Sequence, residues 1–140
     1  GTAGGIVKKQ TVQILEECTQ LAFEGRISFP EVVQNLSRAG IERYCADLVT
    51  FQKIYYTPEG ESASVALPLQ DAPGIAVLFT DEGVDAAVRA SQRGEIDYPE
   101  FLRRIMKAGV VYYDVFLKGR KAIYTGRNGD FRIEPFPVAK

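Results

Sequence analysis

Two stretches of this chain carry the same pattern and decide its fold. Residues 25–44 read GRISFPEVVQNLSRAGIERY, and residues 94–113 read GEIDYPEFLRRIMKAGVVYY. The second stretch follows the first by 69 residues, close to half of the 140-residue chain, and seven of the twenty aligned positions are identical. Because unrelated sequences would share roughly one such position, the pattern indicates an internal duplication.

Each copy carries the start and end signals of a helix. Ser28–Glu31 and Asp97–Glu100 both have the spacing of a capping box, in which the first side chain and the fourth residue satisfy each other's backbone amides. Gly40 and Gly109 suit the left-handed position just after a helix. The sequence therefore predicts one capped helix in each copy.

Further elements flank these two helices. The 3.6-residue apolar period predicts preceding helices at Lys8–Glu24 and Asp81–Arg93, with Thr80 as the N-cap of the second. After each capped helix the period changes to two, which is typical of strands. The expected strands lie around Tyr44–Leu48 and at Lys53–Thr57, Ser62–Leu67, Ile75–Phe79, Val110–Leu117, Arg120–Thr125 and Asp130–Phe136.

These elements predict an α+β fold. Each repeat, at about residues 8–67 and 80–136, is a helix-helix unit followed by a three-strand antiparallel meander, and a linker at about residues 68–74 joins them. Neither repeat alone can bury both faces of its helix and strand layers. We therefore expect residues 1–140 to form a single domain with pseudo-two-fold symmetry. Its helices are expected to pack on one side of the antiparallel sheets.

Composition points to an ordered cytoplasmic protein. Hydrophobic residues make up 46% and charged residues 25%, which argues against disorder. The apolar run Ile75–Phe79 is far short of a membrane span, so no membrane association is expected. Gly1–Gly5 lacks the order of a secretory signal. Two cysteines, Cys18 and Cys45, are too few to provide a disulfide framework for a domain of this size, so free thiols are expected.

Few catalytic or metal-binding arrangements fit this sequence. Histidine is absent, which removes His-based triads, His general bases and His-containing metal sites. Arg89–Glu100 superficially resembles a calcium loop, but arginines occupy early ligand positions. Cys45 has no obvious base, and an Asp47–Asp114 carboxylate pair is the one acid–base arrangement to consider. We expect no cofactor and no metal, and we assign no catalytic residue.

Two groups of residues are candidate binding surfaces. Adjacent tyrosines in a strand place one ring on each face, so Tyr56 or Tyr112 is expected to line an exposed aromatic surface. Phe101–Arg132 carries eight basic and two acidic residues, in a chain whose net charge is −1. This excess indicates either a solvated helix face with hairpin tips or a surface for an anionic partner. The candidate basic residues are Arg103, Arg104, Lys107, Lys118, Arg120 and Lys121.

The second repeat resembles a known family. Residues 94–101 (GEIDYPEF), residues 107–110 (KAGV) and the strand with Lys121, Tyr124 and Thr125 look like the C-terminal part of the YdfO-like family. These are small bacterial proteins, many carried on prophages, some labelled "phage envelope protein". The resemblance covers roughly Ser91–Pro137. It departs at Pro99, which is often another residue in that family, and it implies an α+β fold without an established activity.

The sequence supports three hypotheses about function. The first is a non-catalytic cytoplasmic binding or interaction protein, of phage origin, that acts through a sheet surface or through self-association. The second is binding of nucleic acid or another polyanion through the basic second repeat. The third is a small enzyme or ligand carrier with a pocket between the repeats. A protein partner or self-association is favoured over nucleic acid.

Overall fold

Helix pairs and strand triplets alternate along the chain. The computed structural model describes residues 7–138, so the Gly1–Gly5 stretch lies outside the described residues. The first half contains α1 (Lys9–Phe23), α2 (Phe29–Arg38), β1 (Arg43–Asp47), β2 (Gln52–Tyr56) and β3 (Ser62–Ala66). The second half contains α3 (Asp81–Gln92), α4 (Tyr98–Lys107), β4 (Val110–Phe116), β5 (Lys121–Gly126) and β6 (Phe131–Pro135). The predicted α+β class is confirmed.

The six strands form one antiparallel sheet in the order β3-β2-β1-β4-β5-β6. Each triplet is a meander, and the two meanders meet where β1 pairs with β4, with Tyr44 opposite Val115 and Ala46 opposite Tyr113. β3 and β6 are therefore the outer strands. The sheet is continuous across both halves of the chain.

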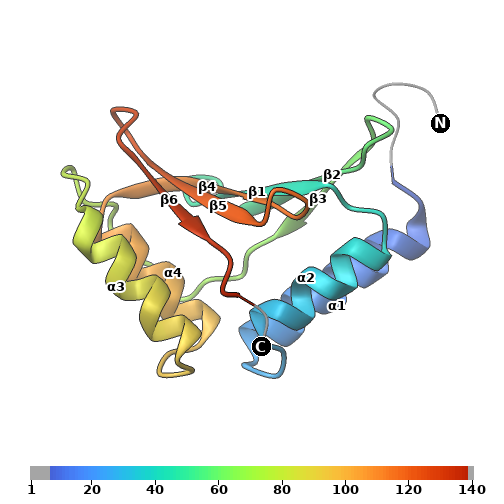
Figure 1. Ribbon diagram of the computed structural model, residues 1–140, viewed down its shortest axis with the longest axis horizontal. Helices are drawn as coiled ribbons and strands as arrows, with labels where there is room; N and C mark the ends of the chain where they lie inside the picture. Colours follow the sequence, from blue (N-terminus) through green and yellow to red (C-terminus); the bar gives the residue numbers. More distant parts are fainter. Residues whose placement is uncertain (1–6, 139–140) are drawn as a thin grey trace.

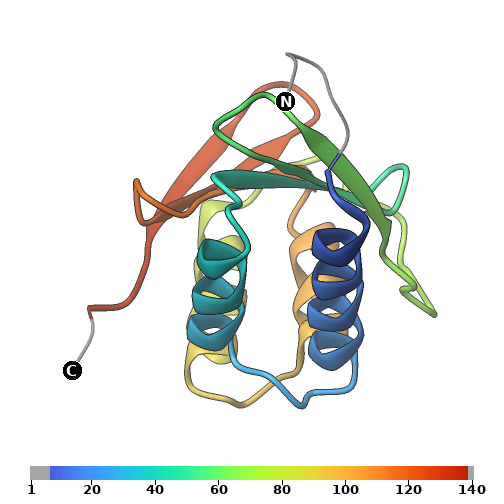
Figure 2. The ribbon, with the colours of Figure 1, turned by 90° about the vertical axis from the view of Figure 1, so that its right-hand side faces the viewer.

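All four helices lie on one face of this sheet, as expected (Figure 1). The pair α1/α2 lies under one end of the sheet and the pair α3/α4 under the other, and the two pairs converge away from the sheet (Figures 1 and 2). At the point of convergence the α1–α2 turn meets the α3–α4 turn, and the rings of Phe23 and Tyr98 pack edge-to-face with centroids 5.3 Å apart. We call the sheet face toward the helices the inner face.

Strand alternation assigns the core to the inner face. Alternate residues of both central strands are buried, including Tyr44, Ala46, Tyr113 and Val115. Because successive strand residues point to opposite faces, their neighbours in sequence lie on the outer face. The apolar stripes of the helices complete this core.

The first predicted capping box is present. Ser28 Oγ accepts a hydrogen bond from the Glu31 amide, and the Glu31 carboxylate accepts one from the Ser28 amide at 3.0 Å. The helix ends as a Schellman motif, because the Ile41 amide donates to Leu36 O and the Gly40 amide donates to Ser37 O. Gly40 has φ of +84°, the left-handed value that this end requires.

The second capping box is only half formed. Asp97 accepts a hydrogen bond from the Glu100 amide at 3.0 Å, as predicted. The Glu100 carboxylate does not complete the box, and it pairs instead with Arg103 and Arg104 at 3.3 and 3.2 Å. An ionised aspartate in the cap position repels a second carboxylate, and two arginines one turn away attract it.

Of two local predictions before α3, one is wrong and the other is met in position only. Ile75–Phe79 is irregular, not a strand: the Ala76 amide donates to Met106 O, and the Thr80 amide donates to Ala108 O. This segment therefore satisfies carbonyls at the end of α4 instead of joining the sheet. Thr80 occupies the N-cap position, but its side chain makes no capping hydrogen bond.

Candidate ligand-binding site

A cavity of about 850 Å³ lies between the inner face of the sheet and the two helix pairs. The inner face forms its roof, the α1–α2 and α3–α4 turns line its opposite sides, and Pro135–Pro137 passes along it. We call this space the inner cavity. It lies on the side of the sheet where the two helix pairs diverge toward the strands (Figure 1).

Four inward tyrosines and one lysine dominate the roof and its surroundings. Tyr113 and Tyr124 are paired across β4 and β5, with ring centroids 5.0 Å apart, and Tyr44 and Tyr55 are paired across β1 and β2 at 5.3 Å. Lys53 pairs with Ala46 across β2 and β1. Tyr44, Tyr113, Tyr124 and Lys53 line the inner cavity.

Lys53 is the unusual residue of this roof. Its side chain is only 3% exposed, and its Nζ lies 4.9 Å from the ring centroid of Tyr44 and 4.7 Å from that of Tyr98. These rings attract the ammonium through their negative faces. Within the described residues, no carboxylate forms an ion pair with Lys53.

Burial changes the protonation behaviour of this group. Removal of the ammonium from water lowers the pKa of Lys53 to about 8. The amine therefore remains mainly protonated at neutral pH and becomes neutral just above it. A charged donor at the surface of an apolar cavity can bind an anion strongly, because little water competes for it.

The tyrosine hydroxyls in the same region are neutral hydrogen-bonding groups. Tyr98 and Tyr113 hydrogen-bond to each other through their hydroxyls, and Tyr55 shares a 3.2 Å hydrogen bond with Thr19 on α1. Burial raises the pKa of each of these tyrosines and of Tyr44. They remain protonated at neutral pH and can donate to a ligand.

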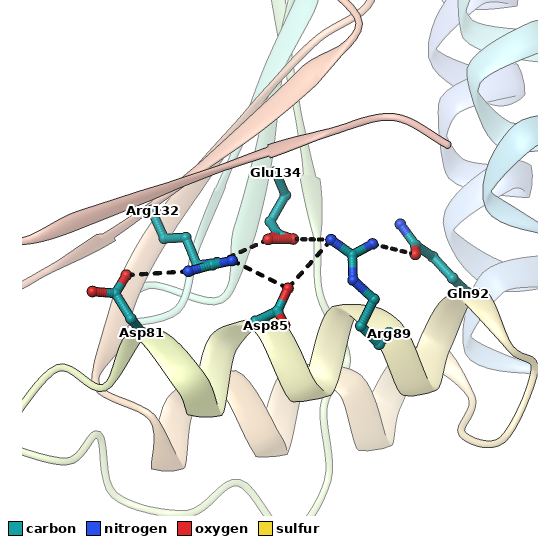
Figure 3. Close-up of polar contacts among 6 residues, drawn as sticks. All are labelled: Asp81, Asp85, Arg89, Gln92, Arg132 and Glu134. Carbon is teal, nitrogen blue, oxygen red and sulfur yellow. Dashed lines mark hydrogen bonds and ion pairs between the residues drawn. The ribbon is translucent and has the colours of Figure 1, made fainter. Parts of the chain in front are cut away.

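Glu134 is the second buried charged residue on the inner face, and the protein itself neutralises it. Figure 3 shows its carboxylate between two arginines: Arg132 Nε donates to Oε1 at 2.8 Å, and Arg89 Nη2 donates to Oε2 at 3.2 Å. Asp85 Oδ1 lies 3.2 Å from both guanidinium groups, and Asp81 lies 3.7 Å from Arg132. This cluster ties β6 to α3 and fixes one side of the inner cavity.

The rim of the inner cavity is polar and its interior is aromatic. Arg26, Glu31 and Glu95 are exposed lining residues of the helix turns, whereas Phe101 and Tyr113 are buried lining residues. Among residues 7–138, no group of three or more cysteine, aspartate or glutamate side chains is placed to hold a metal ion. The arrangement can enclose an apolar molecule and hold one polar group of it at Lys53.

The predicted aromatic residues lie elsewhere. Tyr56 and Tyr112 point to the outer face of the sheet, where Tyr56 packs under the Arg43 guanidinium with 3.9 Å between Cζ and the ring centroid. Tyr56 pairs with the first residue of β1, and Tyr112 pairs with Asp47 at its end. The structure therefore places the two tyrosines on the same face but does not bring them together. Binding by this face stays a prediction.

The predicted basic residues divide into two groups. Arg103, Arg104 and Lys107 lie on α4, and Lys118, Arg120 and Lys121 lie at the turn between β4 and β5. The seven-residue strand β4 separates the groups by roughly 20 Å. Arg103 also donates to Gln70 O at 3.0 Å, and Arg120 lies over the ring of Phe136. A polyanion surface made by these residues stays a prediction.

The outer sheet face also holds the thiol and carboxylates considered from sequence. Cys45 pairs with Asp114 across β1 and β4, and burial together with this carboxylate raises the pKa of Cys45 to about 12. Asp47 accepts hydrogen bonds from the Val49 and Thr50 amides at 2.8 and 3.0 Å, which orders the turn after β1. Cys18 is buried in α1, and both cysteines are free thiols, as predicted.

Sequence reasoning missed Lys53 and Glu134. A signal existed for Lys53, because strand alternation from Tyr55 places it on the inner face. None existed for Glu134, because the apolar residues of its strand, Phe131 and Ile133, are the exposed ones. A charged residue at an inward strand position is rare unless it is paired or functional.

No helix of the described residues is both long and apolar enough to cross a membrane.

Comparison with known proteins gives mycobacterial relatives. The chain is 30% identical over 112 residues to "Uncharacterized protein Rv2012" of Mycobacterium tuberculosis (strain ATCC 25618 / H37Rv) and to "Uncharacterized protein Mb2035" of Mycobacterium bovis. In each case the aligned region covers 80% of this chain and 68% of the relative. No family model matches the chain. These names assign no activity, so the site must be interpreted from its own chemistry.

Proposed function

This chain belongs to the same family as the mycobacterial proteins Rv2012 and Mb2035, and we propose that it is a non-catalytic binding protein that encloses a small molecule in the inner cavity. The observation that carries the proposal is the inner cavity itself. Its volume of about 850 Å³ falls within the range of natural small-molecule sites, roughly 300 to 1,000 Å³. Its aromatic interior and few polar groups are typical of such sites.

The distribution of polar groups favours binding over catalysis. General acid–base or nucleophilic chemistry needs two or more polar groups that converge on the same reacting atom. Lys53 on β2 and Glu134 on β6 are separated by three strands. Glu134 is also occupied by Arg89 and Arg132. One charged contact for a bound molecule, with only neutral tyrosine hydroxyls near it, suits a carrier or sensor.

A neutral fluorescent probe tests this proposal. N-phenyl-1-naphthylamine brightens when it enters an apolar site, and we expect saturable binding to the wild-type protein. Ser91→Trp places a large ring on the α3 side of the inner cavity, and it should weaken binding by at least about tenfold. Ala86→Trp puts the same ring on the exposed face of the same helix and should leave binding unchanged. Equal binding by all three proteins would contradict the proposal.

The origin of the fold also belongs among the proposals. We propose that the chain arose by duplication of an ααβββ unit, because the element order repeats and the 69-residue offset aligns β1 with β4 and β2 with β5. Membership of the YdfO-like family, prophage origin and a cytoplasmic location are proposals as well, supported by the sequence alone. A designed chain with two identical copies of one repeat would test the duplication by whether it folds.

Polyanion binding through the second half is less well supported. Arg103 and Arg104 are already paired with Glu100, while Lys118, Arg120 and Lys121 lie at the far end of β4. A gel-shift assay with duplex DNA at low salt decides this alternative, because counterion release makes such binding strongest there. A shift that Lys118→Glu and Lys121→Glu remove would favour it over the enclosed-ligand proposal.

A further inference from the structure

Lys53 is a buried cation for which the described part of the chain supplies no anion. Its side chain is 97% removed from solvent and faces the inner cavity, yet it takes part in none of the ion pairs among residues 7–138. A buried ammonium is costly unless an opposite charge compensates it. Because Lys53 lines the inner cavity, a ligand in that cavity could bring the missing charge.

The groups that surround Lys53 are all neutral at physiological pH. The titratable ones are Cys18 from α1, Tyr44 from β1, Tyr98 from α4 and Tyr55 from its own strand, and β3 places the apolar Val65 opposite Lys53. Burial raises the pKa of all four. The two tyrosine rings nearest to Nζ stabilise the ammonium but carry no charge.

Glu134 cannot act as the counter-ion. Four strand spacings separate β2 from β6, which corresponds to roughly 19 Å. Its carboxylate is also held by Arg89 and Arg132. The inner cavity therefore has one end at which a positive charge is available and another at which the negative charge is already neutralised.

We propose that the ligand is a small molecule with an apolar body and a single carboxylate, and that this carboxylate binds the Lys53 ammonium. The inference rests on the proposed function, since it names the ligand class of the same cavity. The apolar body would lie against Tyr113, Tyr124 and Phe101, which line the interior. One ammonium matches one negative charge.

The proposed duplication indicates that Lys53 is not needed to form the sheet. At the 69-residue offset, Tyr44 aligns with Tyr113 and Tyr55 aligns with Tyr124, so the aromatic roof is the same in both halves. Lys53 aligns with Ala122, which is buried on the inner face and needs no partner. The fold therefore accepts alanine at this position, and the lysine is not required to build the sheet.

Two probes that differ only in charge test the inference. Biphenyl-4-carboxylate and biphenyl-4-methanol have nearly the same size and shape, and isothermal titration calorimetry measures the affinity of each for the wild-type protein. We expect the acid to bind at least about tenfold more tightly than the alcohol. Lys53→Met should remove this preference and leave the affinity for the alcohol unchanged, while the exposed Lys107→Met should change neither.

A pH series on the wild-type protein provides a second measurement that does not depend on a variant. The probe's carboxylate stays ionised above about pH 6. The Lys53 proton is lost as pH rises through about 8. Affinity for the acid should therefore fall by about tenfold between about pH 7 and about pH 9, while affinity for the alcohol stays constant.

The outcomes separate this inference from the proposed function. Equal binding of acid and alcohol at all pH values, with Lys53→Met unchanged, would overturn the carboxylate assignment and leave the enclosed-ligand proposal standing. If neither biphenyl probe binds and Ser91→Trp does not affect the naphthylamine probe, both proposals fail. A preference for the acid that survives Lys53→Met would place the anion site elsewhere and would also overturn the inference.

Discussion

Lys53 and Glu134 are the two buried charged residues in the described part of the chain, and they lie on the same sheet face near opposite edges. Their neighbouring side chains differ. Glu134 is held by two arginines that connect β6 to α3, so its charge is part of the scaffold. Lys53 has aromatic neighbours and no anion, so its charge is available to a ligand. This asymmetry distinguishes the structural end of the inner cavity from the end at which we propose that a ligand binds.

The ligand-free protein should become more stable as pH rises from about 7 to about 9.5. The unfolded chain holds the lysine proton up to a pKa of about 10.4. The folded protein releases it at about 8. Between these values the unfolded state binds more protons, so the free energy of unfolding increases with pH. The difference between the two pKa values corresponds to about 3 kcal/mol, which is the upper limit of the gain.

Urea denaturation across this pH range measures the effect, and Lys53→Met serves as the reference. The variant lacks the buried charge, so it should be more stable than the wild type near pH 7 and should show a flatter pH profile. The series must end near pH 9.5, because burial raises the pKa of Tyr44 and Tyr98 and their ionisation favours unfolding at higher pH. Parallel profiles for the two proteins would contradict the prediction.

Glu134→Gln should lower the free energy of unfolding by about 1 to 3 kcal/mol. Glutamine keeps the shape of the side chain and one acceptor oxygen, but it removes the buried negative charge and turns an NH2 donor toward one of the two arginines. Glu95→Gln is the matched control, because Glu95 pairs with Arg93 at 2.7 Å on the exposed α3–α4 turn. Exposed pairs contribute roughly 0 to 1 kcal/mol, so the control should change stability less. An equal decrease in the free energy of unfolding for both variants would show that the Glu134 cluster contributes no more stability than an exposed ion pair.

Much of this fold could be predicted because its signals are local. The period change after Gly40 and Gly109, together with the capping residues Ser28 and Asp97, is enough to place both capped helices and the strands that follow them. The packing of helices on one side of the sheet follows from the inward apolar positions of the strands. The pairing of β1 with β4 has no such local signal, because many registers would bury the same residues.

The wrong strand prediction at Ile75–Phe79 and the missed inner cavity both depend on tertiary contacts, which local sequence patterns do not show. Ile75–Phe79 has the composition of a strand, but tertiary contacts with the end of α4 determine its backbone. The inner cavity depends on how far the two helix pairs diverge, which no residue pattern encodes. Lys53 was visible as a charge at an inward strand position, yet its importance depends on the lack of a partner, and only the assembled structure shows its surroundings.

Ser28→Ala should destabilise the protein by about 1 kcal/mol, whereas Thr80→Ala should have a much smaller effect. Both residues occupy N-cap positions, but only the Ser28 side chain makes capping contacts, with the amide and carboxylate of Glu31. Urea denaturation of both variants measures the difference. A larger loss for Thr80→Ala would mean that the Thr80 hydroxyl contributes a contact beyond capping.

Gly109→Ala should cost more stability than Gly40→Ala, although both glycines follow a helix with positive φ, at +93° and +84°. Alanine in the left-handed region is strained at either position, at about 1 kcal/mol. At Gly109 the new Cβ would also lie 2.4 Å from Leu78 O and 2.8 Å from Phe79 Cα, whereas at Gly40 nothing lies within 4 Å. Because these contacts are backbone atoms, the irregular 75–79 segment would have to move.

The difference between Gly109→Ala and Gly40→Ala measures the contribution of residues 75–79, because the backbone strain is nearly the same in the two variants. We expect the free energy of unfolding to fall by at least about 1 kcal/mol more for Gly109→Ala than for Gly40→Ala. Displacement of the segment should also break the hydrogen bonds from the Ala76 and Thr80 amides to the end of α4. Faster amide exchange at these two residues in Gly109→Ala would identify that cause. Equal losses without faster exchange would mean that the segment moves aside freely and does not fix the end of α4.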